Sequence, residues 1–264
     1  MRFAKLLIKG LAARAGYEIR AIRRNPSRLT PDARFGLNVL GYLAEELLAH
    51  SGAAALSLLQ VGANDGRDED SVHDILERHT IPAILCEPLP DTFTRLTHTY
   101  SGFDHVRLAQ CAIASYDGEL ELYRIAPDGG KEFSKIASFN RDHVEQFRRR
   151  SELPAESVVS ETVPCKTIRS LLAAYGRETI DIAVVDTEGM DHLICSQFLE
   201  ISPPPTIIQF EYCNSPIDSV KLLMERLTTL GYRFARSGLD ITAARPGSSV
   251  RVPVEPAQDI NSPT

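Results

Sequence analysis

The strongest pattern in the chain is LSLLQVGANDGRDEDSVHDILERHTIPAILCE, residues 56–87. It consists of a short apolar run, a turn with two glycines, an amphipathic segment and a second apolar run that ends on a carboxylate. Short leucine-rich runs followed by turn residues are typical of strands covered on both faces of a parallel sheet. This order predicts the first half of a nucleotide-type α/β fold, in which ligands bind at the strand ends.

The turn between the two runs has the features of an anion site. Gly62 and Gly66 allow sharp turns and a close approach of the backbone to a ligand. Ser71, with Asp74 three residues later, predicts a capping box and a helix that begins near Asp70 or Ser71. The free N–H groups of the turn and of this helix start would bind a carboxylate or a phosphate.

The carboxylate at the end of the second run extends this site. Glu87 follows Gly66 by 21 residues, and at that position a carboxylate can accept both hydroxyls of a ribose. The pair predicts an adenosine-containing ligand. VGANDG departs from GxGxxG, so an ordinary tight turn between strand and helix is the alternative. The departure favours a ligand without a pyrophosphate, and S-adenosylmethionine is the candidate.

Composition limits the class of protein. The chain has 264 residues, 43% of them hydrophobic, which is enough for one α/β domain with a full core. Its net charge of −6 is uneven, because residues 1–30 hold eight Lys or Arg and one Glu and the remainder carries −13. An acidic body predicts no nucleic-acid partner.

Cysteine usage and hydropathy predict a cytoplasmic protein. The five cysteines are scattered in contexts that look buried, which predicts core thiols, and there is no CxxC pair: Cys86, Cys111, Cys165, Cys195 and Cys213. Their odd number and spacing predict reduced thiols, not disulfides or structural zinc. No apolar run approaches the roughly 20 residues that span a bilayer, and lysines and arginines interrupt any signal-peptide core near the N-terminus.

Residues 1–50 are predicted to form a basic helical extension. Apolar residues between positions 3 and 11 fall on one helical face, and arginines follow up to Arg28. Such a segment can lie peripherally on an anionic membrane surface. Packing on the body, or a solvated extension, is the alternative. Thr30 and Pro31 then predict the start of a helix whose apolar residues run to Leu47.

Strands and helices continue to alternate after Glu87. Asp91 is predicted to cap a helix, HVRLAQCAIAS to be a strand that runs into a turn, and Asp117-Gly118 to begin a hairpin. Thr167 caps a further helix, which is predicted to end near residue 176.

The regular pattern breaks down over residues 127–164. This segment contains a glycine pair, the dipeptide Ser138-Phe139 and the charged tract FRRRSE. A long irregular insertion is more often a lid or a substrate loop than a plain connection, and partial disorder is the competing interpretation.

A second stretch that contains candidate functional residues is IDIAVVDTEGMDHLI, residues 180–194. Asp186 and Glu188 follow its buried strand, and Asp191 and His192 begin the next helix. PTIIQFEY is a further strand that ends in Glu211. Two successive strands close the pattern, so we expect a mostly parallel sheet with an antiparallel C-terminal edge.

Taken together, the ordered motifs resemble the FkbM-type S-adenosylmethionine-dependent O-methyltransferases. The motifs are VGANDG, CEP, CAIAS, VPCKTI, VVDTEGMD, IIQFE and GYRF, and they cover about residues 55–245. The resemblance implies a Rossmann-like class I methyltransferase fold over residues 51–250, followed by a tail at 251–264. Asp65 departs from the apolar residue that many members have in the glycine turn.

The resemblance also implies roles for individual residues. The methionine portion of the cofactor would be held by the glycine turn, at Gln60, Gly62, Ala63, Asn64 and Gly66. The ribose would be held by Glu87, the adenine would be flanked by Cys111 and Ala112, and the transferring methyl would face Asp186 and Glu188.

Methyl transfer to a hydroxyl also needs a group that takes the proton of the acceptor. The candidates for this base are Asp186, Glu188 and His192, and Glu211, Ser138 and Phe139 are candidates for binding the acceptor. The acceptor is expected to be a sugar, glycan, glycolipid or polyketide-like hydroxyl.

Three alternatives remain at this point. A divalent cation held by Asp186, Glu188, Asp191 and Glu211 could lower the pKa of the hydroxyl, although no ligand spacing enforces it. A nicotinamide-dependent oxidoreductase would share the first strand, turn and acidic strand end, but would need a glycine loop suited to a pyrophosphate. A membrane-associated binding module could keep the fold without catalysis.

Overall fold

A computed structural model describes residues 38–67, 70–126 and 136–245. The predicted helix start at Thr30 and the basic segment 1–30 lie outside these residues. No helix among the described residues is both long and apolar enough to cross a bilayer.

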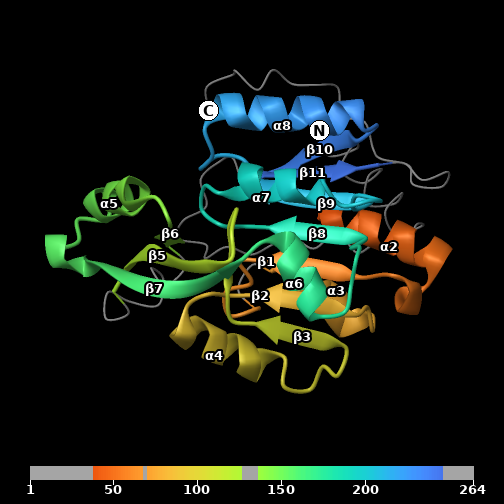
Figure 1. Ribbon diagram of the computed structural model, residues 1–264, viewed down its shortest axis with the longest axis horizontal. Helices are drawn as coiled ribbons and strands as arrows, with labels where there is room; N and C mark the ends of the chain where they lie inside the picture. The colour runs from red at the N-terminus through yellow and green to blue at the C-terminus, as the bar shows by residue number, and fades with distance from the viewer. Residues whose placement is uncertain (1–37, 68–69, 127–135, 246–264) are drawn as a thin grey trace, which may run out of the picture. The chain divides into compact units, whose positions relative to one another are not determined.

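A seven-stranded sheet forms the centre of the fold, in the order β10-β11-β9-β8-β1-β2-β3 (Figure 1). Its strands are β1 (Leu58–Val61), β2 (Ala83–Cys86), β3 (Val106–Ala109), β8 (Ile182–Val185), β9 (Ile207–Glu211), β10 (Arg233–Ser237) and β11 (Asp240–Ala244). Only β11 runs against its neighbours, and it lies between β9 and β10. The mostly parallel sheet is therefore confirmed, with the antiparallel strand next to the edge strand β10.

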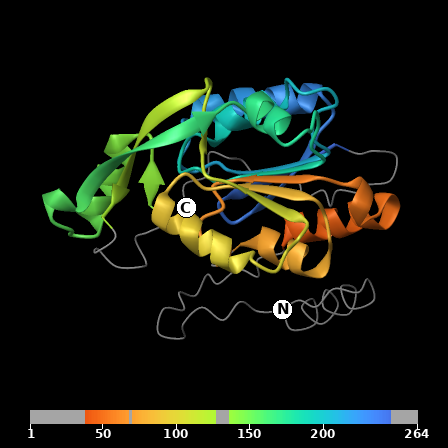
Figure 2. The same cartoon turned by 60° about the horizontal axis from the view of Figure 1, so that its bottom comes forward.

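Helices cover both faces of this sheet, which Figure 2 shows as a layer on either side. One face packs on α2 (Val39–Ser51), α3 (Ser71–Arg78) and α4 (Pro90–Thr99), and the other on α6 (Ile168–Ala174), α7 (Asp191–Phe198) and α8 (Ile217–Thr229). Successive residues of β1 point to opposite faces of the sheet, so Leu58 packs in the core on the α2, α3 and α4 side and Leu59 in the core on the α6, α7 and α8 side. The compact unit that contains the sheet begins at Val39, and α2 shares a core with the sheet.

A second, four-stranded sheet stands beside the first, in the order β4-β7-β5-β6. It consists of β4 (Ala112–Ile113), β5 (Gly118–Ile125), β6 (Ala137–Ser138) and β7 (Val158–Lys166), with the helix α5 (Arg141–Arg150) between β6 and β7. Short 3-10 turns occur at η2 (Ala53–Ala55) and η5 (Ala155–Ser157). The small core of the four-stranded sheet includes Leu122 and Val163.

This second sheet corrects two predictions. The described part of the insertion, 136–164, is not irregular, because it holds α5 and most of β7, which pairs along the whole of β5. Asp117-Gly118 does not begin a hairpin with the strand before it, since β4 pairs in parallel with β7. Long-range pairing between β5 and β7 leaves no local sequence signal, which is why the sequence pattern missed it.

Two predicted helix caps also differ. Asp70 caps α3 by accepting a hydrogen bond from the Val72 N–H, so Ser71 is the first helical residue and not the cap. Asp91 is not the cap of α4, because the helix begins at Pro90 and Leu89 is the N-cap, so Asp91 lies inside the first turn. Its carboxylate binds the guanidinium of the buried Arg124 at 2.7 and 3.0 Å, which supplies the partner that a buried charge needs. Thr167 caps α6 as predicted.

Candidate functional site

The β1 turn, residues 62–66, joins three strand ends at one edge of the sheet. The Gly62 and Ala63 N–H groups both donate to the Cys86 carbonyl, at 3.0 and 2.9 Å. The Asp186 N–H donates to the Val61 carbonyl at 3.0 Å. The carboxyl ends of β1, β2 and β8 therefore meet at this turn, as the parallel register requires.

The two glycines of the β1 turn are needed for packing. Gly62 has φ +82° and Gly66 has φ +70°, values that glycine adopts without strain. A Cβ at Gly62 would lie 1.8 Å from the Asp186 carbonyl oxygen, and a Cβ at Gly66 would lie 2.5 Å from the ring of Tyr100. Glycine at both positions thus lets the turn pack against β8 and α4.

Glu87 links the end of β2 to the β1 turn. Its two carboxylate oxygens accept hydrogen bonds from the Asn64 and Leu89 N–H groups, both at 3.0 Å. The residue is 6% exposed, and this burial raises the pKa of Glu87 to about 7. Each oxygen still has a second lone pair for a further donor.

Cys111 and Ala112 lie just beyond β3, and both are buried. Cys111 packs in the same core as β2. The contact between its thiol and that of Cys86, together with burial, raises the pKa of Cys86. Ala112 packs in the core of the second sheet. These two positions form the junction between the two sheets.

The β8 turn, residues 186–191, is held by hydrogen bonds among its own residues. Asp191 is fully buried and accepts from the Thr187 N–H, the Thr187 hydroxyl and the Gly189 N–H, at 3.4, 3.1 and 3.2 Å. Burial raises its pKa to about 7. Glu188 has φ +53°, and a Cβ at Gly189 would lie 2.9 Å from the Asn214 carbonyl oxygen. Asp191 therefore fixes the path of this turn.

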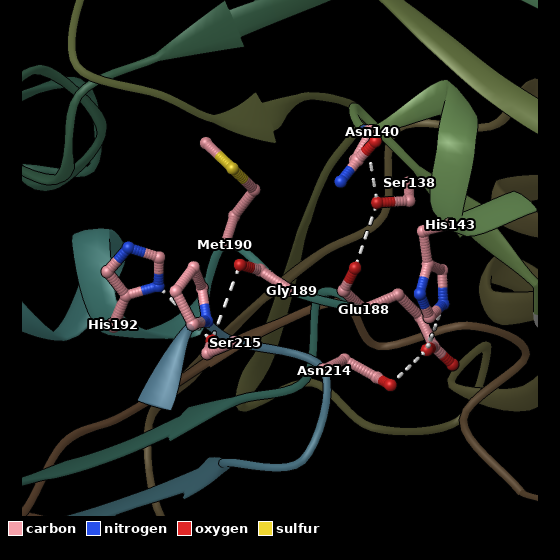
Figure 3. A pocket seen from close by; sticks show the side chains of 10 residues that line it. Ser138, Asn140, His143, Glu188, Gly189, Met190, His192, Asn214 and Ser215 are labelled. Atoms are coloured by element: carbon pink, nitrogen blue, oxygen red, sulfur yellow. Dashed lines mark hydrogen bonds and ion pairs between the residues drawn. The ribbon is translucent and has the colours of Figure 1, made fainter. Parts of the chain in front are cut away.

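A cavity of about 390 Å³ opens beside the β8 turn (Figure 3). Seven of the ten residues that line it have polar or charged side chains, which is why it is called the polar cavity below. The ten come from β6, α5, the β8 turn, α7 and the loop after β9: Ser138, Asn140, His143, Glu188, Gly189, Met190, His192, Asn214, Ser215 and Pro216. The segment around α5 thus supplies one wall of the cavity, through residues that the sequence pattern had left in an irregular insertion.

Glu188 is the centre of one side of the cavity. Its carboxylate accepts from the Asn214 amide at 2.7 Å and lies 3.4 Å from His143 Nε2, and its carbonyl accepts from the Ser138 hydroxyl at 2.8 Å. The carboxylate of Glu188 raises the pKa of His143. Asn214 also donates to Glu211 at 2.7 Å, and burial followed by the charge of Glu188 raises the pKa of Glu211.

His192 lies on the other side, where Figure 3 shows it next to Ser215. The Ser215 hydroxyl donates to the Gly189 carbonyl at 3.3 Å, and His192 Nδ1 lies 3.1 Å from the same hydroxyl oxygen. Because the serine proton is already used, Nδ1 is assigned as the donor and Nε2 keeps a lone pair in the neutral ring. Burial lowers the pKa of His192, which favours this neutral form.

Asp186 differs from the other carboxylates of the β8 turn, because it is exposed. Protein around its carboxyl still desolvates it, and the charges of Glu211 and Glu188 add to this, so its pKa is raised well above the usual range.

The structure brings some predicted site residues together and separates others. Ser138, Glu188 and His192 line one cavity, and Glu211 is connected to it through Asn214. Phe139 packs against the core of the second sheet and does not line the cavity. A second cavity of about 520 Å³, between the β1 turn and α4, is lined by Asp65, Arg67, Thr94, Arg95, His98 and Thr99. Neither cavity is lined by Gly62, Glu87 or Asp186.

Four residues that complete the polar cavity were missed: Asn140, His143, Asn214 and Ser215. They lie in an insertion or a loop, where no periodicity marks them. Within residues 38–67, 70–126 and 136–245 there is no group of three or more His, Cys, Asp or Glu side chains arranged to hold a metal ion. The carboxylate of Asp191, one member of the predicted cation set, is used inside the β8 turn.

The strand order, the single antiparallel strand and the polar residues at the strand ends define a Rossmann-like class I methyltransferase fold. A family model, the methyltransferase FkbM domain, matches residues 60–234. The chain belongs to the FkbM family of S-adenosylmethionine-dependent methyltransferases. No curated protein matches the chain.

Solved structures with similarity to this chain include three methyltransferases. Methyltransferase FkbM from Methylobacillus flagellatus KT is 11% identical with a TM-score of 0.44, over 73% of this chain and 45% of that one. The METTL16 MTase domain is 10% identical with a TM-score of 0.43, over 90% and 77%. The O-methyltransferase from Bacillus cereus in complex with SAH is 9% identical with a TM-score of 0.39, over 91% of each chain.

Proposed function

We propose that this protein is an S-adenosylmethionine-dependent O-methyltransferase that acts on a hydroxyl of a sugar, glycan, glycolipid or polyketide-like acceptor. The observation that carries the proposal is the polar cavity beside the β8 turn, within the segment that matches the FkbM domain. Amide, hydroxyl, imidazole and carboxylate groups converge there, and these are the partners that acceptor hydroxyls need.

The cofactor has a suitable place at the neighbouring strand ends. Two observations fit it: Glu87 keeps free lone pairs at the end of β2, and two buried oxygens that flank the β1 turn, on Gln60 and Asp70, have no hydrogen-bond donor. When bound, S-adenosylmethionine supplies an electrophilic methyl group. Gln60, Gly62, Ala63, Asn64 and Gly66 would hold its methionine portion, Glu87 its ribose, and Cys111 and Ala112 would flank its adenine.

The acceptor proton is best taken by His192. Its assigned tautomer presents an unprotonated Nε2, whereas the Glu188 carboxylate is already paired with Asn214 and His143. Asp186, with its raised pKa and its carbonyl against Gly62, would lie at the boundary between cofactor and acceptor. Ser138 and Glu211 would position the cavity wall through Glu188 and Asn214.

The compartment is part of the same proposal. All five cysteines are unpaired, in keeping with a cytoplasmic protein. The other four are buried as predicted, but the prediction of a core position was wrong for Cys213, which is exposed. Membership of a methyltransferase family leaves the nicotinamide-dependent alternative without support.

The test is a transfer assay with isotopically labelled S-adenosylmethionine, a panel of methyl hexopyranosides and fractionated surface glycans, read by mass spectrometry. We expect label in an O-methyl ether, and we expect His192→Gln to reduce turnover by a factor of about 10² or more while cofactor binding is retained. Label on nitrogen or carbon, or no binding of cofactor at millimolar concentration, would overturn the proposal.

A further inference from the structure

Two free thiols lie together where β2 and β3 end. Cys86 is the last residue of β2, and Cys111 follows the end of β3 by two residues. Cys86 pairs in register with Ala109. The Ala109 carbonyl accepts from the N–H groups of Glu87 and Cys111, at 3.1 and 3.0 Å, which holds the backbone at Cys111 beside the end of β2. Both cysteine side chains pack in the core on the α6, α7 and α8 side, and their thiols are in contact.

Cys165 is a third thiol in this part of the fold, but it is held differently. It lies opposite Ala112 in the register of β4 and β7. Its S–H donates to the Tyr116 carbonyl at 3.5 Å, and its side chain packs in the core of the second sheet. Cys86, which shares a core with Cys111 and contacts its thiol, is therefore the better placed partner.

The two thiols in contact differ in acidity. The contact with Cys86 lowers the pKa of Cys111, and the charge of Lys166 acts in the same direction. The same contact, together with burial, raises the pKa of Cys86. The thiolate is the nucleophilic form of cysteine, so Cys111 is the sulfur that reacts and Cys86 is its resolving partner. Exposure agrees with this order, since Cys111 is 4% exposed and Cys86 is fully buried.

We infer that Cys86 and Cys111 form a redox-active dithiol, which hydrogen peroxide converts to a disulfide at the junction of the two sheets. The Cys111 thiolate attacks one peroxide oxygen, the O–O bond breaks, and the departing hydroxide takes up the proton that Cys111 had released. Cys86 then attacks the sulfur of the resulting sulfenic acid, the S–O bond breaks, and water leaves with the Cys86 proton. Two thiols are oxidised to one disulfide, and one peroxide is reduced to two waters.

The backbone is suited to this bond. The chain at Cys111 is held to the end of β2 through the Ala109 carbonyl, and neighbouring strands lie about 4.8 Å apart, within the Cα separation that a disulfide tolerates. The bond would join the strand end that carries Glu87 to the segment that begins β4 at Ala112.

The test is peroxide treatment of the folded full chain, in a Cys213→Ser background that removes the exposed thiol. Remaining thiols are alkylated, and a non-reducing tryptic digest is read by mass spectrometry. Cleavage after Arg95 and Arg107 puts Cys86 on peptide 79–95 and Cys111 on peptide 108–124, while Cys165 lies on peptide 151–166.

We expect peptides 79–95 and 108–124 to be joined, with the loss of two hydrogen atoms, and dithiothreitol to separate them. Cys86→Ser should leave the Cys111 sulfenic acid without its partner, where dimedone traps it. Cys165→Ser is the matched control and should form the link as the parent does. A link between peptides 108–124 and 151–166, oxidation of Cys111 to a sulfinic acid without a link, or two unmodified thiols in excess peroxide would overturn the inference.

A second measurement connects the dithiol to the cofactor, and it rests on the proposed function, in which Cys111 flanks the adenine. S-adenosylhomocysteine at ten times its Kd leaves about one site in eleven empty, so formation of the link should slow by about tenfold. If the link forms at an unchanged rate while calorimetry shows that the ligand is bound, the adenine does not cover Cys111. If the ligand does not bind, the proposed function fails and the dithiol stands on the peptide result.

Discussion

The two turns at the carboxyl edge of the sheet have opposite hydrogen-bonding states. In the β8 turn, Thr187, Gly189 and Glu188 are tied to Asp191, Ser138 and Asn214. The β1 turn is fixed by its glycines and by Glu87, but the Gln60–Asp70 pair beside it keeps two unpartnered oxygens. A turn whose polar groups are satisfied internally is a rigid wall, whereas one that retains unpaired acceptors has binding capacity left.

The largest expected effect tests the packing of the β1 turn. Gly62→Ala places a Cβ 1.8 Å from the Asp186 carbonyl oxygen, a backbone atom that cannot move alone. We expect a loss of more than about 4 kcal/mol of unfolding free energy, or no folded protein. Gly176→Ala is the matched control, because Gly176 also has positive φ but nothing lies within 4 Å of its Cβ position. That control should lose only about 1 kcal/mol in urea denaturation, and equal losses would contradict our account.

The next effect tests the internal bonds of the β8 turn. Asp191→Ala removes the acceptor for three donors, so we expect a loss of about 2–4 kcal/mol in the free energy of unfolding. Asp218→Ala also removes an acid from the first turn of a helix, but the Asp218 side chain is 93% exposed. It should cost less than about 1 kcal/mol. Similar losses for the two variants would show that the β8 turn is not held by Asp191.

Stability should also depend on pH in the opposite sense to ordinary acid denaturation. Burial raises the pKa of Glu87 from 4.5 to about 7 and that of Asp191 from 3.8 to about 7. Between these values the folded state binds more protons than the unfolded state, so unfolding free energy is greatest below about pH 4.5 for these groups and falls as the pH rises to 7.

The measurement is thermal unfolding at pH 5 and pH 8, without cofactor. We expect a higher melting temperature at pH 5, with Glu87 contributing up to about 3 kcal/mol. Glu87→Gln should reduce the difference, whereas Glu119→Gln, at an exposed position on β5, should leave it unchanged. A melting temperature that is equal at the two pH values would be the contrary result.

The smallest effect concerns the link between Glu188 and Glu211. Asn214→Ala removes an amide that donates to both carboxylates at 2.7 Å, and we expect a loss of about 1 kcal/mol at pH 8. Asn214→Asp should be worse at pH 8, since it adds a third negative charge, and should recover in part at pH 5, because burial raises the pKa of Glu211. If the two variants were equally stable at pH 8, the amide would not be separating the charges.

The parts of the fold that depend on local pattern could be predicted from the sequence. The β1 strand, the glycine turn, the Thr167 cap and the carboxylates after β8 all lie where periodicity and turn residues place them. The second sheet could not be predicted, since β5 and β7 are far apart in sequence and their pairing depends on tertiary contacts. Asp91 is not a cap because α4 begins one residue earlier, at Pro90, and its ion pair with the buried Arg124 joins segments far apart in sequence.

The site divides in the same way. Glu188 and His192 follow the buried strand β8 at the carboxyl end of the sheet, so topology brings both to one cavity, whereas Asp186 follows the same strand but does not line it. His143, Asn140 and Asn214 enter the cavity from an insertion and a loop, where only three-dimensional packing places them. Asp70 was predicted only as one possible start of α3, and both its role as the cap and its unpartnered oxygen are visible only in the structure.

The central claim is that the β1 turn, Glu87 and Asp186 surround one cofactor. A crystal structure with S-adenosylhomocysteine bound tests it most directly. Our account predicts the amino-acid portion against residues 60–70, the ribose hydroxyls within hydrogen-bond distance of Glu87, and the sulfur facing Asp186 and the polar cavity. A ligand seated between the β1 turn and α4, in the cavity lined by Arg67 and Arg95, would contradict it.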